Sequence, residues 1–245
     1  MPAPRFYSPT PPSGAPSLEL PAPAAHHAIR VLRLRVKDAV QLFDGNGHAW
    51  QGSISEISGK RVLLENLQAC TDNRESPLRI VLAQALCGSE KMDWVVQKAT
   101  ELGVTEIQPV QTRRSVARLS GERAGKRTEH WRAVTIAACE QCGRNVLPPV
   151  HAPQEFSAWL AAMHNAPGNK FILLPQATGT LHEHAQPQGT VILLIGPEGG
   201  FDKDEAQLAQ QAGFIAIRLG ARVLRTESAA IAGLAALQTL WGDFI

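Results

Sequence analysis

The spacing of apolar residues changes along the chain. Up to residue 72 the apolar runs are short and broken by polar turns, and residues 39–43, 49–54 and 61–64 have the composition of strands. Two turn sequences separate them, Asp44-Gly45-Asn46-Gly47 and Ser58-Gly59, and both carry the glycines that hairpins favour. The pattern predicts a small β-rich domain over residues 1–72.

After a polar, proline-containing segment at residues 73–78 that fits a linker, strand-like and helix-like periods alternate. Helices are predicted over residues 90–102 and 228–241 and around Trp131 and Val134, with Ser89 as a cap and Gly103 as a stop for the first. The predicted strands cover residues 79–83, 105–110, 171–174, 191–195 and 214–219. This order predicts a largely parallel sheet with helices on both faces over residues 73–245.

The strand Val191–Ile195 is apolar at every position, which is typical of a central strand covered on both faces. Gly196, Gly199 and Gly200 follow it, and residues without a Cβ atom let a ligand approach the main chain closely. Asp202 and Glu205 form a predicted capping box for the next helix, which Gly213 would end. The loop fits either a tight strand-to-helix turn or a ligand loop. It matches neither GxGxxG nor GxxxxGK[ST], so a dinucleotide or P-loop site is disfavoured.

A second strand, residues 214–219, opens onto a second loop before helix 228–241, for which Thr226 or Ser228 can supply the cap. Loops at the carboxyl ends of parallel strands are where open α/β sheets bind ligands. The helix has an apolar face beside a stripe of small residues, and it is too short for a membrane span. The stripe fits either ordinary core packing or contact with a partner helix or second subunit; its members are Ala229, Ala232, Gly233 and Ala236.

Composition narrows the class of protein. Hydrophobic residues make up 44% and charged residues 19% of the chain, values typical of a soluble globular protein. The proline-rich start lacks the apolar run of a signal peptide, which predicts a cytoplasmic protein. Of the 4 cysteines, Cys139 and Cys142 form a C-x-x-C without a second pair at zinc spacing, so we expect reduced thiols and no metal.

Positive charge is concentrated in two segments, although the net charge is only +2. Arg30, Arg33, Arg35 and Lys37 have no acid among them, which fits either contact with a phosphate backbone or a solvated amphipathic segment. Residues 113–132 hold seven bases and two acids, a local charge of +5. A helix laced with salt bridges is possible there, but phosphate contact is favoured because the acids nearby in sequence are too few to pair the bases.

Four segments together resemble one family. IGPEGGF, LGARVLRTESAA, EKMDWVVQKATELGV and AACEQCGRNVLPP are similar to the RsmE-type enzymes of the SPOUT methyltransferase class, and the resemblance extends over nearly the whole chain. Two departures are Ser228, where the family commonly has threonine, and Lys37-Asp38, where Gly-Asp is common.

The resemblance implies an α/β fold of two domains. Residues 1–72 would form a PUA-like RNA-binding β-barrel, and residues 73–245 a SPOUT methyltransferase domain whose parallel sheet ends in a C-terminal trefoil knot, a rare exception to unknotted chains. It also implies homodimerisation through the second domain. The expected activity is methylation of uridine N3 in small-subunit (16S) ribosomal RNA with S-adenosylmethionine and without a metal.

The reaction that the resemblance implies must stabilise a uracil anion, and this chemistry gives candidate roles to individual residues. Arg225 and Arg114 would stabilise the uracil anion, and Glu198 would take the proton or orient the base, unless it caps backbone groups within its own loop. The expected cofactor contacts are Leu174, Pro175, Ile195, Gly196, Pro197, Gly199, Gly200, Leu219, Gly220, Arg222, Val223 and Leu224. The expected RNA contacts are Arg5, Arg30, Arg33, Arg35, Arg114 and Arg144.

Two other functions remain open at the level of sequence. One is a different SPOUT enzyme that methylates a ribose hydroxyl or another base. The other is a non-enzymatic RNA-binding assembly factor that kept the fold. The intact glycine loop and Arg225-Thr226-Glu227 favour an enzyme.

Overall fold

The computed structural model describes residues 3–10, 12 and 17–244 of the chain. The chain divides into two compact units, Met1–Glu75 with Ile136–Leu147 (unit 1) and Ser76–Thr135 with Pro148–Ile245 (unit 2). The division falls inside helix α3 (Gly121–Cys142), so residues 136–147 join the N-terminal part of the chain, which the linear pattern does not indicate. The prediction of no signal peptide rests on the proline-rich start, and part of that start lies outside the described residues.

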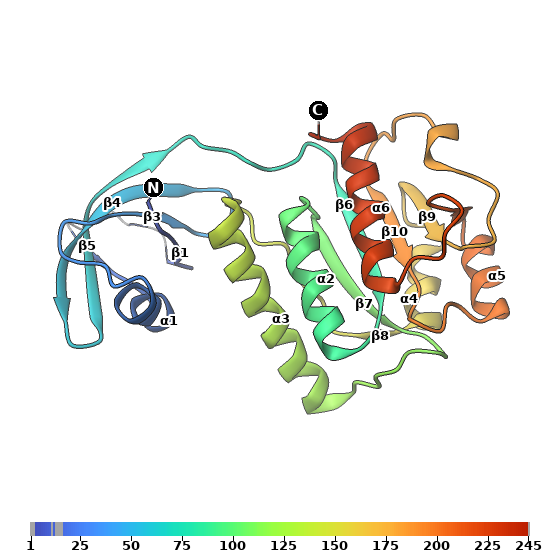
Figure 1. Ribbon diagram of the computed structural model, residues 1–245, viewed down its shortest axis with the longest axis horizontal. Coiled ribbons are helices and arrows are strands. Elements are labelled where there is room, and N and C mark those ends of the chain that lie inside the picture. Colours follow the sequence, from blue (N-terminus) through green and yellow to red (C-terminus); the bar gives the residue numbers. More distant parts are fainter. Residues whose placement is uncertain (1–2, 11, 13–16, 245) are drawn as a thin grey trace. The chain divides into compact units, whose positions relative to one another are not determined.

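Unit 1 holds, in its described part, a five-stranded sheet with the order β1-β3-β4-β5-β2, in which β1 is parallel to β3 and the other pairs are antiparallel (Figure 1). Both predicted hairpins are confirmed, since Phe43 pairs with Ala49 and Ser58 with Arg61. The strands are β1 (Arg5–Tyr7), β2 (Ser17–Glu19), β3 (Ala39–Phe43), β4 (Ala49–Ser58) and β5 (Arg61–Cys70).

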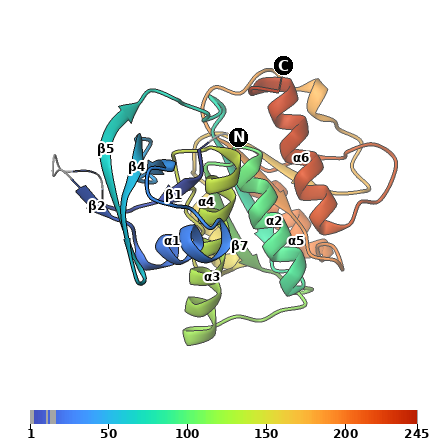
Figure 2. The same ribbon diagram turned by 60° about the vertical axis from the view of Figure 1, so that its left-hand side comes forward.

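The hairpin of β4 and β5 extends further than predicted (Figure 2). The added residues, 55–58 of β4 and 65–70 of β5, are mostly polar and none of them is buried, so hydrophobic spacing ends before the backbone pairing does. Beside the sheet lie the short helices α1 (Ala22–His26) and η1 (His27–Val31). Phe6, Leu42 and Ile54 are fully buried or nearly so in the core beneath them.

Unit 2 contains, among the described residues, a six-stranded sheet that is parallel throughout, with the order β11-β9-β10-β6-β7-β8. The prediction of a parallel α/β domain is therefore confirmed. The strands are β6 (Ile80–Ala85), β7 (Glu106–Gln111), β8 (Gln154–Glu155), β9 (Asn169–Leu173), β10 (Val191–Ile195) and β11 (Ile215–Ile217). A single 3-10 turn, η2 (Leu181–Glu183), lies between β9 and β10.

Helices cover both faces of this sheet. On one face α2 (Ser89–Glu101) and α6 (Thr226–Trp241) lie side by side and share a core with Trp131 of α3 (Figure 1). On the other face α4 (Phe156–Met163) and α5 (Lys203–Gln211) pack on a second core. Successive residues of β10 enter the two cores alternately, Leu193 one and Leu194 the other, which explains why the whole strand is apolar.

The helix ends follow sequence signals in part. Asp202 and Glu205 form the predicted capping box of α5, and Gly213 follows its last turn with φ of +89°. The caps predicted for two other helices are wrong, because Gly88 precedes α2 and Arg225 precedes α6. Thr226 cannot cap α6, since its hydroxyl is engaged with another loop, as described below.

The small-residue stripe of α6 lets this helix approach its own sheet. A methyl group added at Gly233 would lie 2.9 Å from Cδ2 of Leu193 in β10. Ala230, Leu234 and Leu237 are fully buried on the same helix. Of the two interpretations of the stripe, core packing is thus the one that the fold supports at Gly233. No helix in the described part of the chain has the length and apolar character needed to cross a membrane.

Candidate active site

A pocket lies at the carboxyl ends of the neighbouring strands β9, β10 and β11. Its walls come from three loops, residues 173–176, 195–201 and 218–224, which are far apart in sequence and meet because the strand order places β11, β9 and β10 together. Its volume of about 370 Å³ is within the usual range for small-molecule sites.

The pocket brings together all the residues that the sequence analysis expected at a cofactor site. Of the three expected catalytic residues, Arg114 and Glu198 line it, whereas Arg225 does not and is exposed just before α6. The roles of these residues remain predictions. Lining residues that the sequence analysis did not name as contacts are Leu173, Gln176, Phe201, Arg218, Thr226 and Ala229.

Glycines bring bare main chain to the pocket wall. A methyl group at Gly196 would lie 3.0 Å from the ring of Phe201, and one at Gly199 would lie 3.3 Å from Cβ of Arg114. A side chain at either position would therefore press on its neighbour as well as cover the backbone. Apolar side chains such as Ile195 and Leu224 line the same pocket. This combination suits a ligand with a flat apolar body and polar edges that main-chain groups can bind.

A buried hydrogen-bond chain joins two of the loops beneath the pocket. The Thr226 hydroxyl donates to the carbonyl of Gly196 at 2.6 Å and accepts from the side-chain amide of Gln84 at 2.9 Å. Gln84 is fully buried in β6, and its amide also donates to the carbonyl of Ala85. The sequence analysis missed this chain. The available signal was an amide within the apolar run of β6, because buried polar groups need partners.

Arg113 and Arg114, which follow β7, bind the glycine loop and the start of α5. Arg114 donates from Nη1 to the carbonyl of Gly199 at 3.0 Å. The Nη1 atom of Arg113 is 3.0 Å from Asp202 and 2.9 Å from Asp204, while its backbone N–H donates to Glu205. These contacts tie the segment after β7 to the start of α5, directly beside the pocket.

The basic run 113–132 has more acidic partners than its neighbours in sequence supply, because the fold brings others from distant segments. The prediction that the acids are too few to pair the bases is therefore wrong. Besides the pairs of Arg113, Arg127 lies 3.9 Å from Asp93 and Arg118 4.0 Å from Glu155. Fewer unpaired positive charges therefore remain on residues 113–132 than the count of seven bases and two acids indicates.

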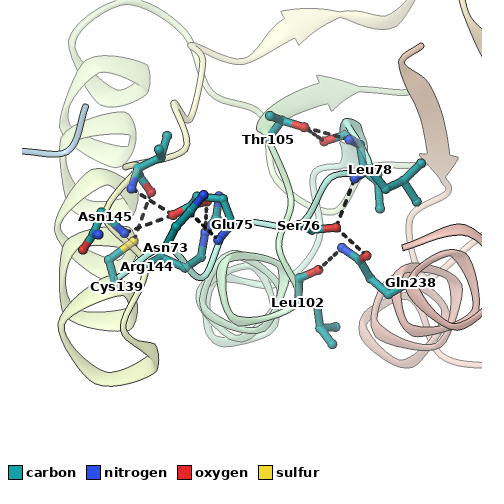
Figure 3. Close-up of polar contacts among 12 residues, drawn as sticks. Asn73, Glu75, Ser76, Leu78, Leu102, Thr105, Cys139, Arg144, Asn145 and Gln238 are labelled. Atoms are coloured by element: carbon teal, nitrogen blue, oxygen red, sulfur yellow. Dashed lines mark hydrogen bonds and ion pairs between the residues drawn. The ribbon is translucent and has the colours of Figure 1, made fainter. Parts of the chain in front are cut away.

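Two of the expected RNA contacts have structural partners within unit 1. Arg144 is only 4% exposed and forms an ion pair with Glu75, with an Nη2–Oε2 distance of 2.7 Å (Figure 3). Arg5 donates to Gln41, to the carbonyl of Arg144 and to Asn145. The prediction that Arg144 faces RNA does not fit its burial. Its guanidinium instead joins residues 144–146 to Glu75, whose carboxylate also accepts from the backbone N–H of Asn145.

The other basic segment is open to solvent. Arg30, Arg33, Arg35 and Lys37 are all exposed, and none of them forms an ion pair within the part of the chain that the structure describes. We call residues 30–37 the cationic loop. Its apolar residues differ in burial, since Val31 is 62% exposed and Val36 48%, whereas Leu34 packs against the core of unit 1. Exposed bases without ion pairs fit both interpretations of this segment, so phosphate contact stays a prediction.

Glu198 is held by groups outside its own loop. Its Oε1 accepts from the backbone N–H of Gly88 at 3.1 Å and from Nζ of Lys91 at 3.2 Å. Burial acts to raise the pKa of Glu198, but hydrogen bonds from the backbone of Gly88, from its own backbone and from Lys91 outweigh it and leave the pKa below its ordinary value. A carboxylate with a lowered pKa is a weaker base, so proton uptake is disfavoured. The alternative that it caps backbone groups within its own loop stays open, because a hydrogen bond from the backbone of Glu198 itself is also among the causes of the lowered pKa.

The cysteines do not form a reactive centre in the described residues. All four are free thiols, and burial raises the pKa of Cys139 to about 12. Such a thiol is protonated and unreactive at neutral pH. No group of three or more potential metal ligands was found among the described side chains.

Comparison with known proteins places this geometry in a family. Residues 74–238 match the RNA methyltransferase domain, and residues 20–65 match the RNA methyltransferase PUA domain. The ribosomal RNA small subunit methyltransferase E of Buchnera aphidicola (subsp. Acyrthosiphon pisum) is 34% identical over 89% of this chain and 86% of its own. The chain belongs to the ribosomal RNA small subunit methyltransferase E family.

Solved structures agree with this family. A ribosomal RNA small subunit methyltransferase E from Neisseria gonorrhoeae, bound to S-adenosylmethionine, is 40% identical with a TM-score of 0.91, covering 99% of this chain and 100% of that one. A putative methyltransferase from Legionella pneumophila, in complex with S-adenosylmethionine, is 37% identical with a TM-score of 0.94 over 100% of both chains. The resemblance identified from the sequence is thereby confirmed.

Proposed function

We propose that this protein is an S-adenosylmethionine-dependent methyltransferase that modifies N3 of a uridine in 16S ribosomal RNA. The observation that carries the proposal is the pocket of bare main chain at the ends of β9, β10 and β11, found in a chain whose family relatives are named ribosomal RNA methyltransferases. The relatives of known structure with bound S-adenosylmethionine support the choice of cofactor.

The pocket residues fit this cofactor. Main-chain groups of residues 195–200 and 219–224 would bind the adenine edge, and Ile195 and Leu224 would pack against its faces. When bound, S-adenosylmethionine supplies a methyl group already activated by the sulfonium charge. The protein must therefore position the uridine and its acceptor nitrogen, and alignment of this kind can contribute about 7–11 kcal/mol.

Uridine N3 carries a proton at neutral pH, so the site must also stabilise negative charge on the uracil oxygens. Arg114 is placed for this role, because it lines the pocket and its guanidinium is fixed by the carbonyl of Gly199. A well-placed donor of this type contributes roughly 3–4 kcal/mol. Arg225 is exposed and unpaired among the described residues, so it can reach the RNA side of the site. We retain it as the second anion-stabilising residue.

The proposal assigns RNA binding to the PUA-like domain, with the cationic loop as its contact surface. We also propose that the sheet of unit 1 closes into a barrel and that a C-terminal trefoil knot forms the pocket. The methyltransferase domain would form the homodimer. Because ribosomal RNA would be the substrate, the protein would act in the cytoplasm. The match of residues 20–65 to the RNA methyltransferase PUA domain supports the assignment of RNA binding to this part of the chain.

Removal of two charges from the cationic loop should weaken RNA binding and flatten its salt dependence. Log affinity falls with log salt, and each phosphate contact adds about 0.9 to the steepness of this fall on a duplex and about 0.7 on a single strand. The double variant Arg30→Ala with Arg33→Ala should therefore make the slope shallower by about 1.4–1.8. Filter binding over a salt series measures this slope. Lys60→Ala, an exposed cation in the β4–β5 turn, is the control and should change it little. An unchanged slope in the double variant would exclude the cationic loop from the contact.

Nucleoside mass spectrometry of ribosomal RNA tests the activity directly. A strain without this protein should lack N3-methyluridine in its 16S RNA, and the purified protein with S-adenosylmethionine should restore it on subunits from that strain. Restoration of a ribose-methylated product would instead indicate a different SPOUT activity. Absence of any methylated product, with RNA binding intact, would indicate an assembly factor.

A further inference from the structure

The described pocket lining has more positive than negative side chains. Among its described lining residues, Arg114, Arg218 and Arg222 carry positive charge, and Glu198 is the only acid. These arginines can serve phosphate or carboxylate groups, but they disfavour a cation. S-adenosylmethionine carries a positive charge at sulfur, whereas its demethylated product, S-adenosylhomocysteine, has a neutral thioether at the same place. A negative charge beside the sulfur would distinguish the two ligands.

Glu198 has a fixed position in the pocket wall. Its side chain is 26% exposed, and the backbone N–H of Gly88 together with Lys91 holds Oε1. Lys91 also lies 3.8 Å from Glu227, so one base stands between two acids and the group has a formal charge of −1. Of these three residues only Glu198 lines the pocket in the described structure. Glu198 is therefore the one acid of this group at the pocket wall, and Gly88 and Lys91 fix its Oε1.

We infer that Glu198 is a specificity-determining residue, which favours the sulfonium of S-adenosylmethionine over the neutral thioether of the product. The inference rests on the proposed function and deepens it. The two ligands differ at sulfur by one methyl group and one unit of charge, and in a partly desolvated pocket a single carboxylate acts on that charge more strongly than it does in water. Loss of the attraction after methyl transfer would weaken retention of the product and favour its exchange.

Isothermal titration calorimetry on the full chain, with three ligands, tests the inference. The probes are S-adenosylmethionine, S-adenosylhomocysteine and sinefungin, which carries an amine in place of the sulfonium. In Glu198→Gln we expect S-adenosylmethionine and sinefungin to bind about tenfold more weakly, equivalent to about 1.4 kcal/mol, and S-adenosylhomocysteine to change less than about twofold. The measured quantity is the ratio of dissociation constants, which a general disturbance of the loop would leave unchanged.

Two variants serve as matched controls. Glu227→Gln removes the same charge from the same group but from a residue that does not line the pocket, so its effect on the ratio should be smaller. Glu129→Gln, on the exposed part of α3, changes net charge alone and should leave the ratio as it is. A larger effect from Glu227→Gln than from Glu198→Gln would contradict the assignment.

The outcomes separate this inference from the proposed function. If the unaltered protein fails to bind S-adenosylmethionine, the proposed function fails. If it binds but Glu198→Gln weakens all three ligands equally, the carboxylate acts on the shared amino-acid part or on the loop, and the inference is overturned while the function stands. An unchanged set of three affinities would overturn it as well.

Discussion

Gly199→Val should raise the dissociation constant for S-adenosylmethionine by at least about tenfold, and by about a hundredfold if the pocket cannot relax. The first atom of the new side chain would lie 3.3 Å from Cβ and 3.5 Å from Cδ of Arg114. Arg114 cannot move freely, because it donates to the carbonyl of Gly199 itself. The branched side chain must therefore displace Arg114 or enter the pocket, and overpacking of this kind costs about 1–3 kcal/mol.

Calorimetry with S-adenosylmethionine measures the loss. Filter binding with 16S RNA should give nearly the unaltered affinity, since the cationic loop is untouched and Arg114 is only one of the expected RNA contacts. Gly125→Val is the matched control, because a side chain at Gly125 in α3 meets nothing within 4 Å. It should leave the cofactor affinity as it is. Unaltered cofactor binding in Gly199→Val would show that the glycine loop is only a turn.

Thr226→Val should destabilise the protein and weaken cofactor binding together. Valine has the shape of threonine but lacks the hydroxyl that donates to the carbonyl of Gly196 and accepts from Gln84. Gln84 is fully buried, so water cannot replace the lost partner of its amide. A buried polar group left without its partner costs about 1–3 kcal/mol, and we expect the free energy of unfolding to fall by this amount. Urea denaturation measures that change, and calorimetry measures the accompanying loss of cofactor affinity.

Thr226→Ser keeps the hydroxyl and should recover most of both properties. A double-mutant cycle with Gln84→Met gives a sharper test, because two residues that act through one hydrogen bond lose less together than the sum of their separate losses. Strictly additive losses would mean that Thr226 and Gln84 stabilise the pocket independently.

Most features set by neighbouring residues were predicted from the amino-acid sequence, although the caps of α2 and α6 were not. The glycines of Asp44–Gly47 place a hairpin where the backbone must turn, and Asp202 with Glu205 caps α5 within one helical turn. The apolar run of β10 marks a strand buried on both faces. Hydrophobic spacing placed most helices and strands and the parallel sheet, whereas the family resemblance supplied the list of pocket residues.

Features that join distant residues could not be predicted in this way. Arg144 lies 69 positions from Glu75, Arg113 lies 91 from Asp204, and Thr226 lies 142 from Gln84. The sequence count treated the arginines as free charges and Thr226 as a helix cap, because local spacing carries no information about which loops meet.

Local order in this protein thus follows from the amino acids in each segment, since turns, caps and strand periodicity depend on residues within a few positions. The partners of its charged and polar side chains follow from the strand order β11-β9-β10-β6, which brings separate loops to one edge of the sheet. A side chain becomes a ligand contact, a clamp or a buried ion pair according to the groups that the folded backbone places within about 3 Å of it, the range of a hydrogen bond.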